Sequence, residues 1–280
     1  MTARVLRRGL LASLLVFFCY LTFCEFFLIT HAMNGIFRPL SHLVLVPAAT
    51  AAGKAVSYHQ VVELAHGMKG FAGAQTNAQA FSEALSVSVH RLYVQSLASA
   101  HDVRVTATEV DAYVVDETIL APGLEVAGWK QSDYEKYLVA PLLLAQRTEM
   151  AVKADDAYQA EALESMESYR KKLAQGMPFA DVAQNFSEDV TAIARGDLGI
   201  MNVGTLPDWL VPALELEPGE ISQVLSAPDA YWTVTMLEYY PSEVPDQAAV
   251  HFRGLAVKKL PFSQILDAMT FDYPPMVFVW

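Results

Sequence analysis

The 280-residue chain is 53% hydrophobic and carries 19 basic against 31 acidic residues, a formal net charge of -12. This length and composition supply enough apolar surface for one large or two small cores. The acidic balance excludes nucleic-acid binding, because phosphate recognition depends on clustered lysine and arginine, and the sequence has no such cluster.

The N-terminal stretch GLLASLLVFFCYLTFCEFFLI, residues 9–29, is apolar over about the 20 residues that a membrane-spanning helix needs. Three arginines precede it, and positive charge ahead of a span favours retention of that end in the cytoplasm. We therefore expect a single-pass protein of the cell membrane whose C-terminal domain lies outside the cytoplasm. A signal peptide cleaved near residues 30–32 is the alternative. Both cysteines, Cys19 and Cys24, fall inside the apolar stretch, so the expected exported part has no disulfide.

Helix-start signals dominate the next hundred residues. Ser57, Thr106 and Ser132 are each followed three residues later by Gln or Glu, which is the pattern of a capping box. Three such starts predict a helical module.

From residue 155 onward the pattern becomes mixed. A polar helix is expected over 155–174, and FADVAQNF at 179–186 has the apolar spacing of a helix with one buried face. The stretches YWTVTMLE at 231–238 and AVHFRGLAVK at 249–258 are rich in β-branched and aromatic residues and predict strands. A further helix is expected near 262–269, so this half is α+β.

Several of these motifs together resemble a known family. The helix MPFADVAQNFSED, the turn GDLG at 196–199, the Pro-Asp-Trp segment, the turn LEPGEIS and the aromatic strand follow one another as in parvulin (PpiC-type) peptidyl-prolyl isomerases, over about residues 160–240. The preceding module, with AAGKAVSYHQVVEL and HRLYVQSLASAHDVRVTATEVDAY, resembles the N-terminal chaperone domain of SurA-like and PrsA-like foldases.

Together with the apolar stretch at residues 9–29, these resemblances predict an α+β architecture with an N-terminal transmembrane helix, a helical SurA-like chaperone domain and a parvulin-like antiparallel sheet with flanking helices. The expected boundaries are 1–34 for the cytoplasmic tip and anchor, 35–154 for the chaperone domain, 155–244 for the PpiC domain, and 245–280 for a C-terminal strand and helix that complete the parvulin-like fold. The strand is needed because the family's usual first strand is missing before the helix at 179–186.

The resemblance also assigns roles to individual residues. Asp189 takes the place of the Cys or Asp that lies beside the rotating bond in parvulins, which makes it the catalytic candidate. Parvulins usually carry one histidine in the first strand and another in the last. Here Gly254 and Trp232 occupy those two positions. The resemblance implies a substrate-binding set made of Leu198, Met201, Leu206, Trp209, Leu214, Trp232 and His251, with Leu206 where Met is usual and Leu214 where Phe is usual.

Each assignment has a structural alternative. Asp189 also suits a helix cap, His251 an ordinary strand histidine, and the tryptophans and leucines a core. The sequence has no metal-ligand spacing and no phosphate-binding loop, so we expect neither a metal nor a cofactor.

The predicted function is a membrane-anchored extracytoplasmic foldase or chaperone of the PpiC family with weak or lost isomerase activity. Its expected partners are unfolded or proline-containing exported polypeptides, and the membrane through the N-terminal helix. The alternative is an active peptidyl-prolyl cis-trans isomerase that uses Asp189.

Overall fold

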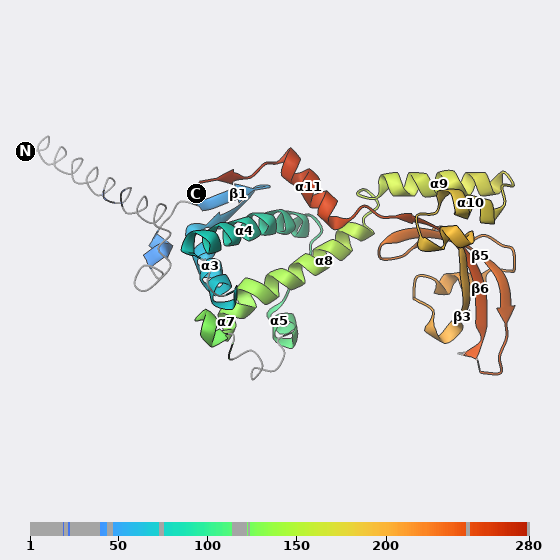
Figure 1. Cartoon of the computed structure of the whole chain (residues 1–280), viewed down its shortest axis with the longest axis horizontal. Coiled ribbons are helices and arrows are strands. Elements are labelled where there is room, and N and C mark those ends of the chain that lie inside the picture. Colours follow the sequence, from blue (N-terminus) through green and yellow to red (C-terminus); the bar gives the residue numbers. More distant parts are fainter. Residues whose placement is uncertain are drawn as a thin grey trace, which may run out of the picture. The chain divides into compact units, whose positions relative to one another are not determined.

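The computed structural model describes residues 40–43, 47–72, 76–113, 124–244 and 247–278, with Cys19, Thr22 and Pro122 as single positions. The chain divides into two compact units (Figure 1). Unit 1 combines the described residues up to Thr148 with those from Leu266 onward, and unit 2 is Glu149–Ile265. Unit 2 is therefore an insertion between two segments of unit 1.

Unit 1 is mainly helical. Its elements are the 3-10 turn η1 (Ser41–Leu43), strands β1 (Pro47–Ala51) and β2 (Lys54–Ser57), helices α3 (Tyr58–Ala72), α4 (Asn77–Ala100), α5 (Ala107–Tyr113) and α7 (Gln131–Tyr134), the π-helical turn η2 (Glu135–Val139), most of α8 (Ala140–Ala154), most of α11 (Phe262–Asp272) and strand β7 (Met276–Val277). Its small sheet has the order β2-β1-β7, with antiparallel neighbours. The C-terminal segment thus completes a sheet that the first described strands begin.

Two of the three predicted capping boxes are confirmed. The Ser57 backbone nitrogen donates to Gln60 Oε1 at 2.9 Å, and the Gln60 nitrogen donates to Ser57 Oγ at 3.2 Å. The Thr106 nitrogen donates to Glu109 Oε2 at 2.8 Å, and the Glu109 nitrogen donates to Thr106 Oγ1 at 3.4 Å. The start of α4 has a further box, at Thr76, that our sequence analysis missed.

The third predicted box, at Ser132, is wrong. Helix α7 begins at Gln131, and the Lys130 nitrogen donates to Asp133 Oδ2 at 2.9 Å. Asp133 therefore closes the start of this helix, and Ser132 lies inside its first turn.

The predictions of a transmembrane helix and of a single-pass membrane location are wrong for the residues that the structure describes. Among the described residues, no helix is both long enough and apolar enough to span a bilayer. The longest of them, α4, has 24 residues, but Glu83, His90 and Arg91 interrupt its apolar surface. The predicted segment itself, residues 9–29, lies outside the described residues except for Cys19 and Thr22.

Unit 2 is built on a four-stranded antiparallel sheet. Its elements are α9 (Ala160–Ala174), α10 (Phe179–Phe186), the 3-10 turn η3 (Val190–Ala194), β3 (Asp197–Asn202), the 3-10 turns η4 (Val203–Thr205) and η5 (Val211–Glu215), β4 (Leu225–Ser226), β5 (Ala230–Tyr240) and β6 (Ala249–Lys258). Helix α9 begins five residues later than expected from 155, because Asp155 accepts the Ala157 nitrogen in a local turn.

Strand β6 occupies the interior of this sheet, whose order is β3-β6-β5-β4. It pairs antiparallel with β3 on one side and with β5 on the other, for example Ile200 with His251 and Trp232 with Ala256. The stretch AVHFRGLAVK thus supplies a central strand from the C-terminal side of the helices.

The two faces of the sheet are covered differently. Leu255 and Val257 of β6 pack with Met166, Leu173 and Val182 from α9 and α10, which defines a helix face. The intervening β6 residues belong to the opposite face, because successive side chains of a strand point to opposite sides. There Val250 and Phe252 form a second core with Leu210, Ala213, Val234 and Met236.

Candidate functional site

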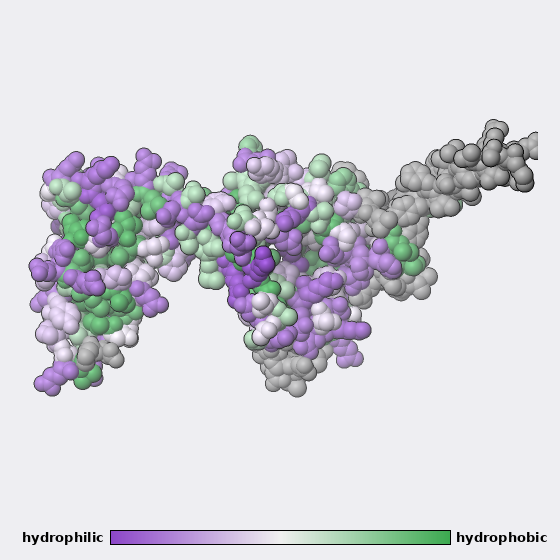
Figure 2. Space-filling view, turned by 180° about the vertical axis from the view of Figure 1, so that it is seen from behind, coloured by the Kyte–Doolittle hydropathy of each residue, from purple (hydrophilic) through white to green (hydrophobic). Residues whose placement is uncertain are grey.

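The face of the sheet opposite the helices carries a set of partly buried hydrophobic side chains. We call this set the apolar face, and its members are Leu198, Met201, Val203, Leu206, Trp209, Leu214, Leu216, Leu225 and Trp232. In the view of Figure 2, hydrophobic residues form a band on the surface of unit 2, drawn on the left, with hydrophilic residues beside it. The apolar face brings together every predicted substrate-binding residue except His251.

Trp232 and Gly254 are in direct contact on this face. A Cβ atom added to Gly254 would lie 2.7 Å from the Trp232 ring and 3.0 Å from Leu198 Cδ1. The Trp232 ring also stacks on Trp209, with ring centroids 5.4 Å apart and an interplanar angle of 24°. The indole therefore fills the space that a side chain at position 254 would need. The two positions that the sequence resemblance aligns with the parvulin histidines are therefore in contact, with a large ring at 232 and no side chain at 254.

Asp189 acts locally as a helix cap. Its Oδ1 accepts the Thr191 backbone nitrogen at 2.8 Å, at the start of η3. The neighbouring residues attach the same segment to β6. Ser187 Oγ accepts the Ala256 nitrogen at 3.0 Å, and Glu188 Oε2 accepts the Lys258 nitrogen at 2.7 Å. Both adjacent carboxylates therefore hold backbone amides, and Asp189 is not one of the residues packed against the second core in the described chain.

The capping role of Asp189 can be tested separately from a catalytic role. We expect Asp189→Ala to lower the free energy of unfolding of unit 2 by about 0.5–2 kcal/mol, because an orphan amide loses its acceptor. Asp189→Asn keeps an oxygen in the same place and should retain most of that stability. Hydrogen exchange of the η3 amides measures the difference. Equal exchange in the two variants would contradict the capping role.

The glycine-bracketed turn that follows allows a close approach of two backbones. Gly196 has φ of 79°, and an added Cβ would lie 2.3 Å from the Gly254 carbonyl oxygen. The Gly254 nitrogen donates to the Gly196 oxygen at 2.7 Å. A glycine is required here both by the left-handed backbone and by the space. The turn thus fixes β3 against β6 and positions Leu198 on the apolar face.

His251 lies on the other side of the sheet. It has the same strand parity as Leu255, which packs on the helix face. Its Nε2 hydrogen-bonds Asp197 Oδ1 at 2.7 Å, and the Gly199 nitrogen donates to the same oxygen at 2.8 Å. The hydrogen bond from His251, followed by the one from Gly199, lowers the pKa of the Asp197 carboxyl. The structure therefore does not place His251 with Trp232.

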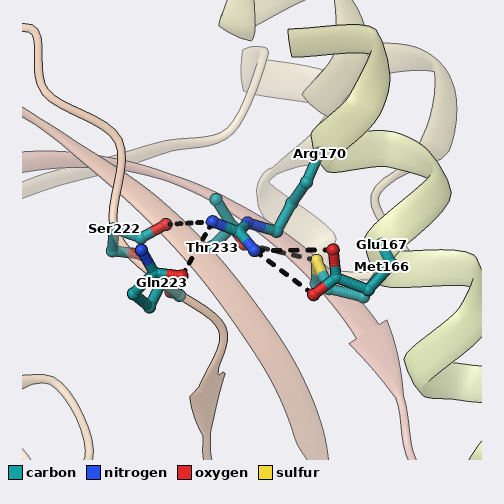
Figure 3. A network of polar contacts seen from close by, with 6 residues as sticks. All are labelled: Met166, Glu167, Arg170, Ser222, Gln223 and Thr233. Carbon is teal, nitrogen blue, oxygen red and sulfur yellow. Dashed lines mark hydrogen bonds and ion pairs between the residues drawn. The ribbon is translucent and has the colours of Figure 1, made fainter. Parts of the chain in front are cut away.

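A polar network on the helix face was missed by our sequence analysis (Figure 3). Arg170 of α9 donates to the Ser222 carbonyl oxygen at 3.4 Å, to Gln223 Oε1 at 3.1 Å and to Glu167 Oε1 at 3.2 Å. Thr233 Oγ1 donates to the Met166 sulfur at 3.4 Å. The Glu167–Arg170 spacing on a helix was the available signal. The network attaches α9 to the segment that leads into β4 and leaves the apolar face untouched.

Among the residues that the structure describes, no group of three or more His, Cys, Asp or Glu side chains is arranged to hold a metal ion. The side chains that make up the apolar face are all aromatic or aliphatic.

Part of the chain is similar to known proteins. Residues 143–237 match the family model described as "Rotamase: PPIC-type PPIASE domain". The chain carries a PpiC-type rotamase domain. The match ends within β5, so the rotamase sheet of this chain takes its central strand β6 from beyond the matched residues.

The curated relatives are chaperones. The chain is 33% identical over 105 residues to the "Chaperone SurA" of Dechloromonas aromatica, covering 36% of this chain and 24% of that protein. It is 31% identical over 137 residues to the protein of the same name from Hahella chejuensis, covering 48% of this chain and 31% of that protein. The second alignment is longer than the rotamase match and so extends beyond it. The predicted resemblance to parvulins with a SurA-like module is confirmed, and the chain spans less than a third of the length of either relative.

Proposed function

We propose that the chain is a foldase of the PpiC family that binds unfolded, proline-containing polypeptides on its apolar face and has weak or no isomerase activity. The rotamase match and the relatives named as chaperones support the family assignment. The location of Leu198, Met201, Leu206, Trp209, Leu214 and Trp232 on one face supports their role in substrate binding.

The observation that carries the proposal is the packing of Trp232 over Gly254. Rotation about a peptide bond has a barrier of about 18–20 kcal/mol. An enzyme lowers such a barrier with polar groups that interact more strongly with the twisted amide than with the planar one. At positions 232 and 254, where the family usually has histidines, this chain has a tryptophan and a glycine. Such a surface holds apolar side chains but offers little to a developing charge.

Asp189 supports the second candidate, an active isomerase. Its carboxylate is half-buried and follows α10, at the position that the resemblance assigns to the catalytic residue. One oxygen of this carboxylate accepts the Thr191 amide, and neither position 232 nor position 254 carries a histidine that could act together with it. We therefore favour the binding surface over the enzyme.

The test compares two activities of the same protein. The rate of cis-trans isomerisation of a short Xaa-Pro peptide is measured beside the suppression of aggregation of a chemically unfolded protein. We expect suppression at stoichiometric concentration together with an isomerisation rate close to the uncatalysed one. Strong acceleration that is lost in Asp189→Asn, a variant that keeps the cap, would favour the active isomerase instead.

A further inference from the structure

The charged side chains on the segments that bear the apolar face are mostly negative. Between Arg195 and Arg253 the sequence contains no lysine or arginine, although this stretch forms β3, η4, η5, β4 and β5. The stretch has exposed carboxylates on the segments that bear the apolar face, namely Asp208, Glu215, Glu217 and Glu220. Asp208 directly precedes Trp209, and Glu215 separates Leu214 from Leu216.

Arg195 and Arg253, which flank this stretch in the sequence, both belong to the helix face. Arg195 forms an ion pair with Asp181 of α10. Arg253 has the strand parity of Leu255, which packs against the helices. Lys258, at the end of β6, has the parity of the apolar face, but it lies at the end where Glu188 accepts a hydrogen bond from its backbone nitrogen. The part of the apolar face around Trp209 and Leu214 thus has anionic neighbours only, among the described residues of its own segments.

The carboxylates of Asp208 and Glu215 make no polar contact that would stabilise the fold among the described residues. In the described part of the chain, neither carboxylate has an ion-pair partner or a side-chain hydrogen bond. By contrast, Glu220 accepts the Glu217 nitrogen at 3.0 Å and so stabilises a turn. Unpaired charges beside a low-dielectric apolar surface create a field that attracts ligands of the opposite sign. Removal of these two charges is therefore expected to change binding without changing the fold.

We infer that the apolar face selects extended polypeptide segments in which lysine or arginine flanks an apolar, proline-containing core, and disfavours segments with acidic flanks. This inference rests on the proposed function, because it names the substrate class of the same face. The apolar core of the peptide covers Trp209, Trp232 and Leu214, and its cationic flank lies beside Asp208 and Glu215. Charge complementarity of this kind gives specificity and faster association more than it gives raw affinity.

The experiment uses the full chain and three labelled peptides that share one apolar proline-containing core and differ only in flanks of two Lys, two Gln or two Glu. Dissociation constants are measured by fluorescence anisotropy. We expect the Lys-flanked peptide to bind on the order of tenfold more tightly than the Gln-flanked one, as two exposed charge pairs allow, and the Glu-flanked peptide to bind more weakly than both. The preference should shrink between ionic strengths of about 0.01 M and about 0.1 M, where the Debye length falls from about 30 Å to about 10 Å.

Matched variants locate the effect. Asp208→Asn with Glu215→Gln should remove most of the preference for lysine and leave the affinity for the Gln-flanked peptide unchanged. The control, Glu161→Gln with Glu164→Gln, removes the same charge from exposed positions of α9 and should keep the preference. Equal binding of all three peptides, or equal loss in both double variants, overturns the inference and leaves the proposed function intact. No binding of any peptide overturns the proposed function, and the inference with it.

Discussion

Phe252→Ala is expected to lower the free energy of unfolding of unit 2 by about 3–5 kcal/mol, the range for truncation of a buried phenylalanine. Phe252 is 0% exposed and lies in the interior strand β6, where it pairs with both Gly199 and Met236. The truncation leaves a cavity between β3, β5 and the η5 segment. Hydrogen exchange read on peptides from β5 and β6 measures the loss for unit 2 alone.

Ile200→Ala is the matched control on the adjacent strand. Ile200 is 61% exposed, so its truncation should change stability by less than about 0.5 kcal/mol. If Phe252→Ala leaves the exchange of β5 as slow as in the unchanged protein, β6 does not contribute to the core of this sheet.

The second large effect is expected in binding. Trp232→Ala removes apolar contact area worth about 1.5–3 kcal/mol, so the dissociation constant for an unfolded client should rise by about tenfold to about a hundredfold. Titration of the labelled Gln-flanked peptide measures it. Trp232→Phe retains most of the apolar area and should lose less affinity, which separates contact area from the tryptophan ring itself.

The same titration needs a test of folding, because Trp232 also packs on Trp209 and over Gly254. Hydrogen exchange of β6 in Trp232→Ala should show that the strand remains protected. An affinity within twofold of the unchanged protein, with β6 protected, would show that clients do not use this face.

Local elements of unit 2 were predictable because their signals are local. The spacing of Phe179, Val182, Ala183 and Phe186 predicts one buried helical face, and α10 forms over those residues with Val182 and Ala183 buried. The stretch AVHFRGLAVK predicts a strand, and β6 spans the same residues. The caps at Ser57 and Thr106 are also local, since each box closes within four residues. The error at Ser132 arose where a neighbouring residue, Asp133, offered a competing acceptor.

Most of the candidate site depended on the family resemblance rather than on pattern alone. The order of helix, glycine turn and aromatic strand was enough to select Leu198, Met201, Leu206, Trp209, Leu214 and Trp232, which the structure brings together on one face. His251 was the exception. Its distance in sequence from Phe252 is one residue, and that single step in a strand moves a side chain to the other side of the sheet.

The sequence by itself determined the helices α9, α10 and α11, apart from their exact ends, the strands β5 and β6, two of the caps and the absence of histidines at positions 232 and 254. Only the tertiary structure decided that β6 lies between β3 and β5, because strand order depends on hydrogen bonds between segments that are distant in the chain. It alone showed that the Trp232 ring occupies the space above Gly254, since this contact joins different strands diagonally across a pair. The structure also showed that Asp189 caps η3, which the sequence had offered as one of two readings of this residue.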